Sequence, residues 1–221
     1  ASIFCCYKHR SYRTKLRTAV CHSPPDGEML TLDGGGGGAA ALNAVFVDLS
    51  GPTLKPVARA SWDLAFYNGD KFRVMINHIN EASAMMTHKT NMNRVKLSDI
   101  QIPNLSIVKG NGSVKLIDDS SGDLDKTVIK EISASESASE DDNKVYIVCS
   151  GGDPVVDNVT KIHVLRHSDK GYTVQYAKIN DDHYKTLVVE KNTTHHFTYV
   201  SFDKGIVVNI EPAKKDWDFV W

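Results

Sequence analysis

The stretch that decides the fold class is residues 62–76, which read WDLAFYNGDKFRVMI. Its two arms, residues 62–67 and 72–76, are rich in the aromatic and aliphatic side chains that favour strands. Between them, Asn68-Gly69-Asp70 is a strong turn signal. The stretch therefore predicts an antiparallel hairpin. Trp62 opens it and is expected to be buried as its anchor, because a side chain of that size removes much apolar surface from water.

Short β-prone runs separated by turn residues continue on both sides of this hairpin. Asn111-Gly112, Gly151-Gly152-Asp153 and Asp203-Lys204-Gly205 are among the turn signals that separate them. This regular alternation predicts an all-β, antiparallel, sandwich-like domain with Trp-Asp strand repeats and one short helix at most, at residues 125–133. The further strands are expected at residues 45–49, 113–117, 144–149, 161–166, 172–179, 186–190, 196–202 and 206–210.

An internal repeat is visible without gaps at a shift of 155 positions. Residues 46–66 lie over residues 201–221, so that Trp62-Asp63 meets Trp217-Asp218. Each copy reads as a strand, a turn, a second strand and then Trp-Asp opening another strand, which indicates a duplication. The first copy continues through a whole hairpin, so the sequence is expected to be truncated at its C-terminus.

Three segments differ in composition. Residues 1–30 are basic and lack strand alternation, and they form an unassigned basic arm. Residues 31–42 contain five glycines followed by three alanines and are expected to be a flexible linker, because no Lys-Ser/Thr follows as a phosphate loop requires. Residues 43–221 form the β domain. Residues 133–142 within it are rich in Ser, Glu and Asp and predict a solvated loop.

Charge and cysteine usage exclude several classes of protein. The chain of 221 residues has a formal net charge of −1, so no global field favours nucleic acid, and no apolar run approaches the roughly 20 residues of a membrane helix. Cys5, Cys6 and Cys21 lie in the first arm, and Cys149 is the only thiol of the β domain. No CxxC pair or zinc-type Cys/His spacing occurs.

No constellation of residues indicates catalysis, and the chain is expected not to be an enzyme. His163 and His167 would share a face of one strand but lie roughly 13 Å apart, too far for one metal ion. Met85-Met86 is read as core filling, with haem-iron ligation as the sharper alternative. Cys149 likewise is read as a buried inert thiol or, more sharply, as a thiolate ligand. No metal site can be assigned from these spacings.

Several segments resemble the HmuY-like family of exported haem-binding proteins from Bacteroides- and Porphyromonas-type bacteria. The resemblance covers about residues 31–221, and its most specific part is the Trp-Asp-Leu-Ala-Phe motif in its setting. The segments are residues 44–50 (AVFVDLS), 61–74 (SWDLAFYNGDKFRV), 89–92 (KTNM), 143–148 (NKVYIV), 171–177 (GYTVQYA), 198–202 (TYVSF) and 217–219 (WDF).

The resemblance implies an all-β hemophore. Such a protein captures haem for iron acquisition and delivers it to a TonB-dependent outer-membrane receptor, and it is secreted or held at the outer-membrane surface as a lipoprotein. The family's founding member holds haem between two histidines, and related members use methionines. Here the second ligand position falls at Ser150 with Cys149 beside it, and the first falls within residues 106–125, which contain no His, Met or Cys.

These positions give two hypotheses. In the first, haem binds weakly or in five-coordinate form and depends on Cys149, with residues 106–125 and 149–160 forming neighbouring loops. In the second, the domain keeps the HmuY-like fold as a surface interaction module that does not bind haem.

Overall fold

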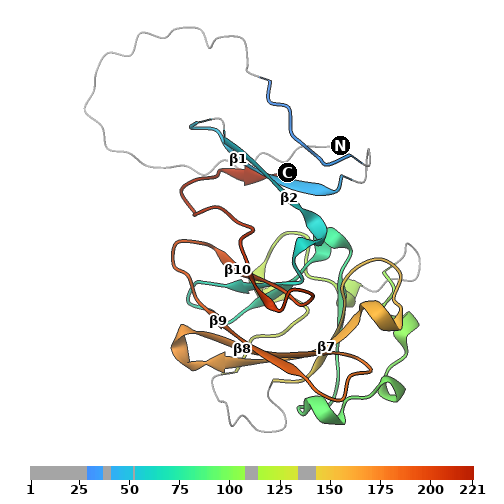
Figure 1. Cartoon of the computed structure of the whole chain (residues 1–221). Coiled ribbons are helices and arrows are strands. Elements are labelled where there is room, and N and C mark those ends of the chain that lie inside the picture. Colours follow the sequence, from blue (N-terminus) through green and yellow to red (C-terminus); the bar gives the residue numbers. More distant parts are fainter. Residues whose placement is uncertain (1–28, 37–40, 52, 108–113, 134–142) are drawn as a thin grey trace, which may run out of the picture. The chain divides into compact units, whose positions relative to one another are not determined.

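A computed structural model describes residues 29–36, 41–51, 53–107, 114–133 and 143–221. The chain divides into two compact units, Ala1–Thr31 and Leu32–Trp221, and the second contains every strand described below (Figure 1). Residues 1–28 of the expected basic arm, residues 37–40 of the expected linker and residues 134–142 of the expected loop lie outside the described residues.

The described strands form three sheets, and every strand pair is antiparallel, as the sequence predicts. The five-stranded sheet has the order β5 (Ser83–Met86), β6 (Tyr146–Cys149), β7 (Val159–His167), β8 (Gly171–Lys178), β9 (Lys185–Glu190). The four-stranded sheet has the order β11 (Ile206–Val208), β10 (Phe197–Ser201), β3 (Leu64–Tyr67), β4 (Val74–Ile76). The three-stranded sheet has the order β12 (Phe219–Val220), β1 (Asn43–Asp48), β2 (Thr53–Ala58).

The main core lies between the five-stranded and the four-stranded sheets, as expected for a sandwich. Tyr172 of β8 lies at its centre and is fully buried, with its ring 5.0 Å from Phe66 and 5.2 Å from Phe72. The Tyr172 hydroxyl donates a 2.8 Å hydrogen bond to the Tyr67 carbonyl, which satisfies the polar end of this buried ring.

A second core covers the other face of the five-stranded sheet. The chain between Met92 and Leu105 supplies its outer side, and Ile147 and Cys149 of β6 lie on its inner side. Lys161 is 2% exposed and ties the covering segment down, because its ammonium donates to the carbonyls of Val95 and Asp181. This sheet is therefore covered by side chains on both faces.

The helical segments of the described residues are all 3₁₀ turns of three or four residues. None of them is long and apolar enough to cross a membrane. They are η1 (Arg59–Ser61), η2 (His78–Asn80), η3 (Met92–Arg94), η4 (Leu97–Asp99), η5 (Ile102–Leu105), η6 (Val114–Leu116), η7 (Leu124–Lys126), η8 (Val156–Asn158) and η9 (Ser168–Lys170).

Two predicted elements are wrong. The expected helix at residues 125–133 is only the turn η7 followed by extended chain, because local side chains take up the backbone groups: Asp118 accepts from the Val128 amide, and Thr127 donates to the Ile129 carbonyl. The expected strand at residues 113–117 is the 3₁₀ turn η6 in its described part.

Trp62 is not the buried anchor of the hairpin. It precedes β3 and is only half-buried, with its ring 5.0 Å from the Tyr199 ring in a T-shaped contact. The buried anchors are Leu64 and Phe66, which alternate onto the core face of β3.

In the structure the two copies of the repeat exchange strands, so that each copy pairs with part of the other. The β1–β2 hairpin corresponds to the β10–β11 hairpin, and each hairpin pairs with the Trp-Asp strand that follows the other one: β10 with β3, and β1 with β12. The ring contacts repeat as well, since Trp62 packs on Tyr199 at 5.0 Å and Trp217 packs on Phe46 at 5.1 Å.

The aspartates of the two Trp-Asp pairs perform the same task in each half. Asp63 accepts a 2.7 Å hydrogen bond from the Phe202 amide, and Asp218 accepts a 2.8 Å bond from the Leu49 amide. Phe202 follows Leu49 by 153 positions, whereas Trp217 follows Trp62 by 155. The gapless alignment is therefore wrong by two residues for the hairpins, because the second copy has two more residues between its hairpin and its Trp-Asp.

Candidate functional site

The expected ligand Cys149 lies inside the second core rather than at a surface. It ends β6, pairs with Ser83 on one side and Val159 on the other, and is 1% exposed. Its Sγ lies 3.9 Å from the Gly151 carbonyl oxygen. Burial raises the pKa of the Cys149 thiol, so the neutral thiol is the favoured form at neutral pH.

Ser150, the other position matched to a haem ligand, forms hydrogen bonds through its amide, its carbonyl and its side chain. Its amide donates to the Asn158 carbonyl, its carbonyl accepts from the Asn80 amide group at 2.8 Å, and its side chain bonds to Asp63. Burial raises the pKa of the Asp63 carboxyl, because desolvation disfavours its charged form. Ser150 thus connects β6 to the Trp-Asp motif.

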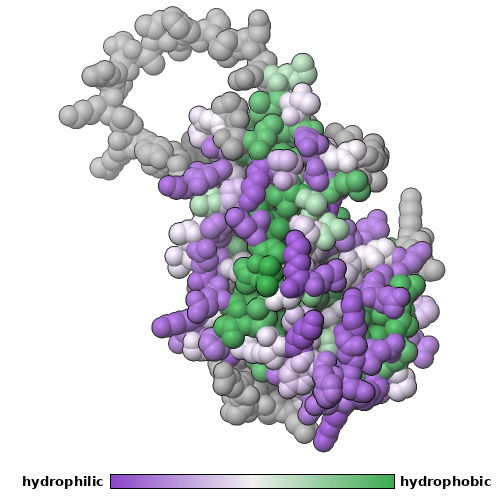
Figure 2. Space-filling model, in the orientation of Figure 1, coloured by the Kyte–Doolittle hydropathy of each residue, from purple (hydrophilic) through white to green (hydrophobic). Residues whose placement is uncertain are grey.

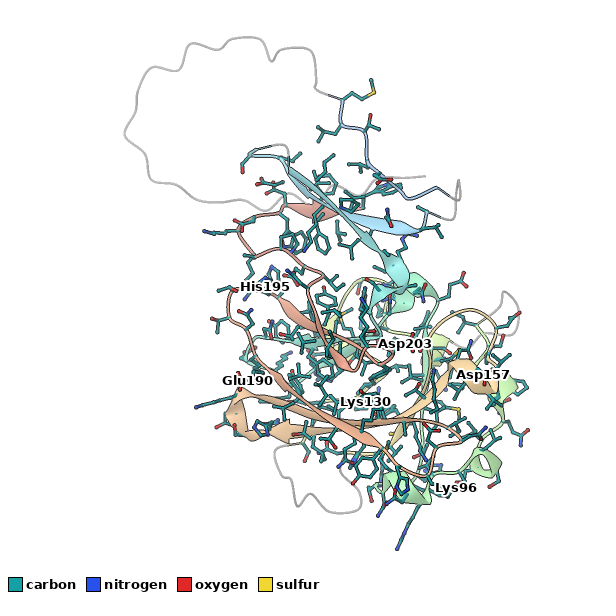
Figure 3. The ribbon with its side chains drawn as sticks, in the orientation of Figure 1. Lys96, Lys130, Asp157, Glu190, His195 and Asp203 are labelled. Atoms are coloured by element: carbon teal, nitrogen blue, oxygen red, sulfur yellow. The ribbon has the colours of Figure 1, made fainter. Side chains whose placement is uncertain are left out.

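The loop after Ser150 is ordered by a single side chain. The side-chain Oδ1 of Asn158 accepts from the Val155 amide, and its side-chain Nδ2 donates to the carbonyls of Gly151 and Asp153. Asp157 of this loop is labelled in Figure 3, in the turn η8 just before β7. The loop between β6 and β7 therefore has a defined conformation, held by the hydrogen bonds of Asn158.

The turn η2 packs against the beginning of this loop. Gly151 has φ +126°, and a Cβ added there would lie 2.0 Å from the Asn80 carbonyl oxygen, so only glycine permits this approach. The buried side chain of Asn77 caps η2 and donates to the carbonyls of Arg59 and Trp62 at 2.7 Å each. The position of η2 relative to the loop is thus set on both of its sides.

His78 opens η2, and its side chain is exposed. It also lies near Asp118, a buried carboxylate that accepts from the Ile76 and Val128 amides. Burial raises the pKa of Asp118, while these hydrogen bonds and the charge of His78 act in the opposite direction. The η2 turn therefore contacts residues 150–151, and its His78 lies near enough to Asp118 to act on that carboxyl electrostatically.

The two segments that the resemblance assigns to haem are neighbours of this turn. Asp118 belongs to the first, and Ser150 and Gly151 belong to the second. Leu105, just before the first segment, accepts a 2.6 Å hydrogen bond from Ser83, which is the register partner of Cys149. Residues 108–113 of the first segment lie outside the described residues.

His163 and His167, the two histidines of β7, have different surroundings. His163 is buried on β7, with its ring nitrogens against Gln175 and the Asn143 carbonyl, whereas His167 is exposed at the end of that strand. Burial lowers the pKa of His163. Each imidazole has its own surroundings, and they share no ligand site.

Haem iron takes imidazole nitrogen, thiolate or thioether sulfur as its protein ligand. Cys149 does not fit, because it is covered and held as a thiol, and the Ser150 side chain is bound to Asp63. The exposed imidazole of His78 fits the donor chemistry. In sequence it is marked only as a histidine two residues after a predicted strand; the contacts that place it between the two segments are long-range.

Across the described ranges there is no group of three or more His, Cys, Asp and Glu side chains that could hold a metal ion. Comparison with protein-family models, curated proteins and solved structures gives no match for this chain.

Proposed function

We propose that this domain is a non-enzymatic haem-capturing protein in which His78 is the iron ligand. The observation that carries the proposal is the position of an exposed imidazole on a rigid turn between residues 114–118 and 150–151. These are parts of the segments that hold haem in the HmuY-like family, which this chain resembles. A single protein donor favours five-coordinate iron.

The surroundings of His78 suit a porphyrin in two respects. Ile79 on the same turn is 39% exposed, and Val155 on the loop after Ser150 is 53% exposed, so both turns present apolar side chains to solvent. Asn77 and Gly151 fix the backbone around η2, which reduces the conformational entropy that ligand binding must overcome. By the same resemblance, delivery to a TonB-dependent receptor and an exported location complete the proposal.

The experiment is a titration of the full chain with ferric haem, followed by absorbance in the Soret region. Wild type is expected to give a sharpened, shifted band. His78→Ala is expected to weaken haem binding at least about tenfold, because it removes the iron ligand. Cys149→Ala is expected to bind like wild type, because the thiol does not reach the surface. His88→Ala is the matched control, since His88 is exposed just beyond the other end of β5.

Unchanged affinity in His78→Ala would contradict this assignment, and a loss confined to Cys149→Ala would restore the thiolate hypothesis. An unchanged free-haem spectrum with wild type would favour the second candidate, a surface interaction module without haem. The observation in favour of that candidate is that Cys149 and Ser150 both serve the packing of the loop.

A further inference from the structure

An aromatic cavity of about 210 Å³ lies where the two halves of the repeat meet, and Ile79 of the turn η2 is one of its lining residues. Its walls come from both halves: Phe46 and Trp62 from the first copy, and Phe197, Tyr199 and Trp217 from the second. In Figure 2 apolar surface gathers in the region where Figure 1 places β1, β12 and β10. His195, labelled in Figure 3, lies two residues before β10, and its neighbour His196 lines the cavity.

The five rings form two contacting groups, one of Trp62, Tyr199 and Phe197 and the other of Phe46 and Trp217. Trp62 and Tyr199 meet at 5.0 Å and 81°, and Phe46 and Trp217 meet at 5.1 Å and 85°. Such edge-to-face contacts leave the electron-rich faces of some rings directed at other neighbours. A cage of this composition attracts an organic cation, because the ring quadrupoles present negative charge at their faces.

A carboxylate stands in the wall of the same cavity. Glu211 is 2% exposed, and its oxygens accept from the amides of His196 at 2.7 Å and Phe197 at 3.0 Å, and from the Tyr199 hydroxyl at 3.5 Å. These three donors are neutral groups. Burial, and after it the charge of Glu211, raise the pKa of the Tyr199 phenol.

Ionised carboxylates have about four acceptor positions, so the Glu211 oxygens retain capacity for a further donor. A buried carboxylate is stabilised by a cationic partner that also satisfies its acceptor positions. Arg59 and His196 also line the cavity, and their side chains would favour an anionic ligand instead. The aromatic walls oppose an anion, since their faces repel negative charge.

We propose that this cavity binds a small aromatic ammonium compound, with its ring among the five aromatic side chains and its ammonium at Glu211. The volume restricts the ligand to a single ring with a short chain. The proposed ligand contacts use neither His78 nor the loop after Ser150, although Ile79, the neighbour of His78, also lines the cavity.

The test compares three probes that share a ring and differ in charge: 2-phenylethylammonium, 3-phenylpropionate and ethylbenzene. Binding to the full chain is measured by calorimetry and by tryptophan fluorescence, since two of the three tryptophans line the cavity. The ammonium probe is expected to bind at least about tenfold more tightly than the other two, as for a hydrogen bond to a charged group. Glu211→Gln is expected to remove that preference.

Trp62→Leu is expected to weaken binding of the ammonium probe, and Trp221→Leu, which does not line the cavity, is expected to leave it unchanged. This pair keeps the test valid if Glu211→Gln fails to fold. Equal affinity for the three probes, tighter binding of the carboxylate, or no binding of any of them would overturn the proposal.

Discussion

Replacing Asp63 with alanine is expected to lower the free energy of unfolding by about 2–3 kcal/mol. The change removes the acceptor of a 2.7 Å bond from the Phe202 amide and a partner of the Ser150 side chain, at a place poorly solvated enough to raise the pKa of this carboxylate. A charge-assisted hydrogen bond contributes roughly 1.5–3 kcal/mol, and an amide left without a partner adds its desolvation penalty. For a domain of this size the melting temperature should fall by roughly 4–12 °C.

Asp218→Ala is the matched control, because Asp218 makes the equivalent bond to the Leu49 amide in the other half of the repeat, at 2.8 Å. Asp218 is exposed, so water can replace the lost acceptor, and the cost is expected to be about 0.5–1 kcal/mol. Asp63→Asn keeps an acceptor oxygen and should cost less than Asp63→Ala. The assay is urea unfolding followed by circular dichroism. Equal losses of unfolding free energy in Asp63→Ala and Asp218→Ala would refute the argument that the greater burial of Asp63 makes its hydrogen bond contribute more.

Three other perturbations follow from the same contacts. Gly151→Ala should destabilise the fold by about 2 kcal/mol or more in urea unfolding, because its Cβ would meet a carbonyl oxygen, whereas Gly122→Ala, with φ +73° and open space around it, should cost only about 1 kcal/mol; similar costs would show that the close approach is not real. Tyr172→Phe should lose about 1–2 kcal/mol, since the Tyr67 carbonyl loses its donor, and an unchanged midpoint would contradict this. Burial lowers the pKa of His163, so the unfolded state binds its proton at a higher pH, and stability should be lost as pH falls below about 6.5. His163→Gln should flatten this acid slope in unfolding measured between pH 7 and pH 5, and an identical slope would assign it to other groups.

The fold class could be predicted because local signals and tertiary structure agree over most of the strands. Asn68-Gly69-Asp70 does separate β3 from β4, and Lys191 holds this turn by donating to the Gly69 carbonyl. The edge strand β2 is expected only through the repeat, as the second strand of its first copy, because Pro56 lies within it and weakens the local signal. The edge strand β5 is absent from the strands that the sequence predicts.

The repeat was predictable in outline but not in register. Trp-Asp stands out because both residues are kept, yet the two extra residues between the second hairpin and Trp217 become apparent only when the paired strands fix the hairpin alignment. Trp62 itself was expected in the core because of its size. In the structure Leu64 and Phe66 of β3 lie in the core, whereas Trp62 precedes the strand, next to η1, and lies in the cavity wall.

The candidate site was the least predictable part, because contacts between distant segments define it. A run such as Val148-Cys149-Ser150 cannot reveal which face of β6 is covered, and here Met92 to Leu105 cover the face that carries Cys149. Likewise, His78 gains its position from Asn80, which contacts a loop some 70 residues away.

The central claim is that His78 ligates haem iron, and the most direct measurement is resonance Raman spectroscopy of the ferrous haem complex. Five-coordinate iron with one histidine ligand gives an iron–imidazole stretching band. We predict this band in wild type and in His88→Ala and Cys149→Ala, and its loss in His78→Ala. A band that persists in His78→Ala, or a wild-type complex with thiolate or no protein ligation, would contradict the account.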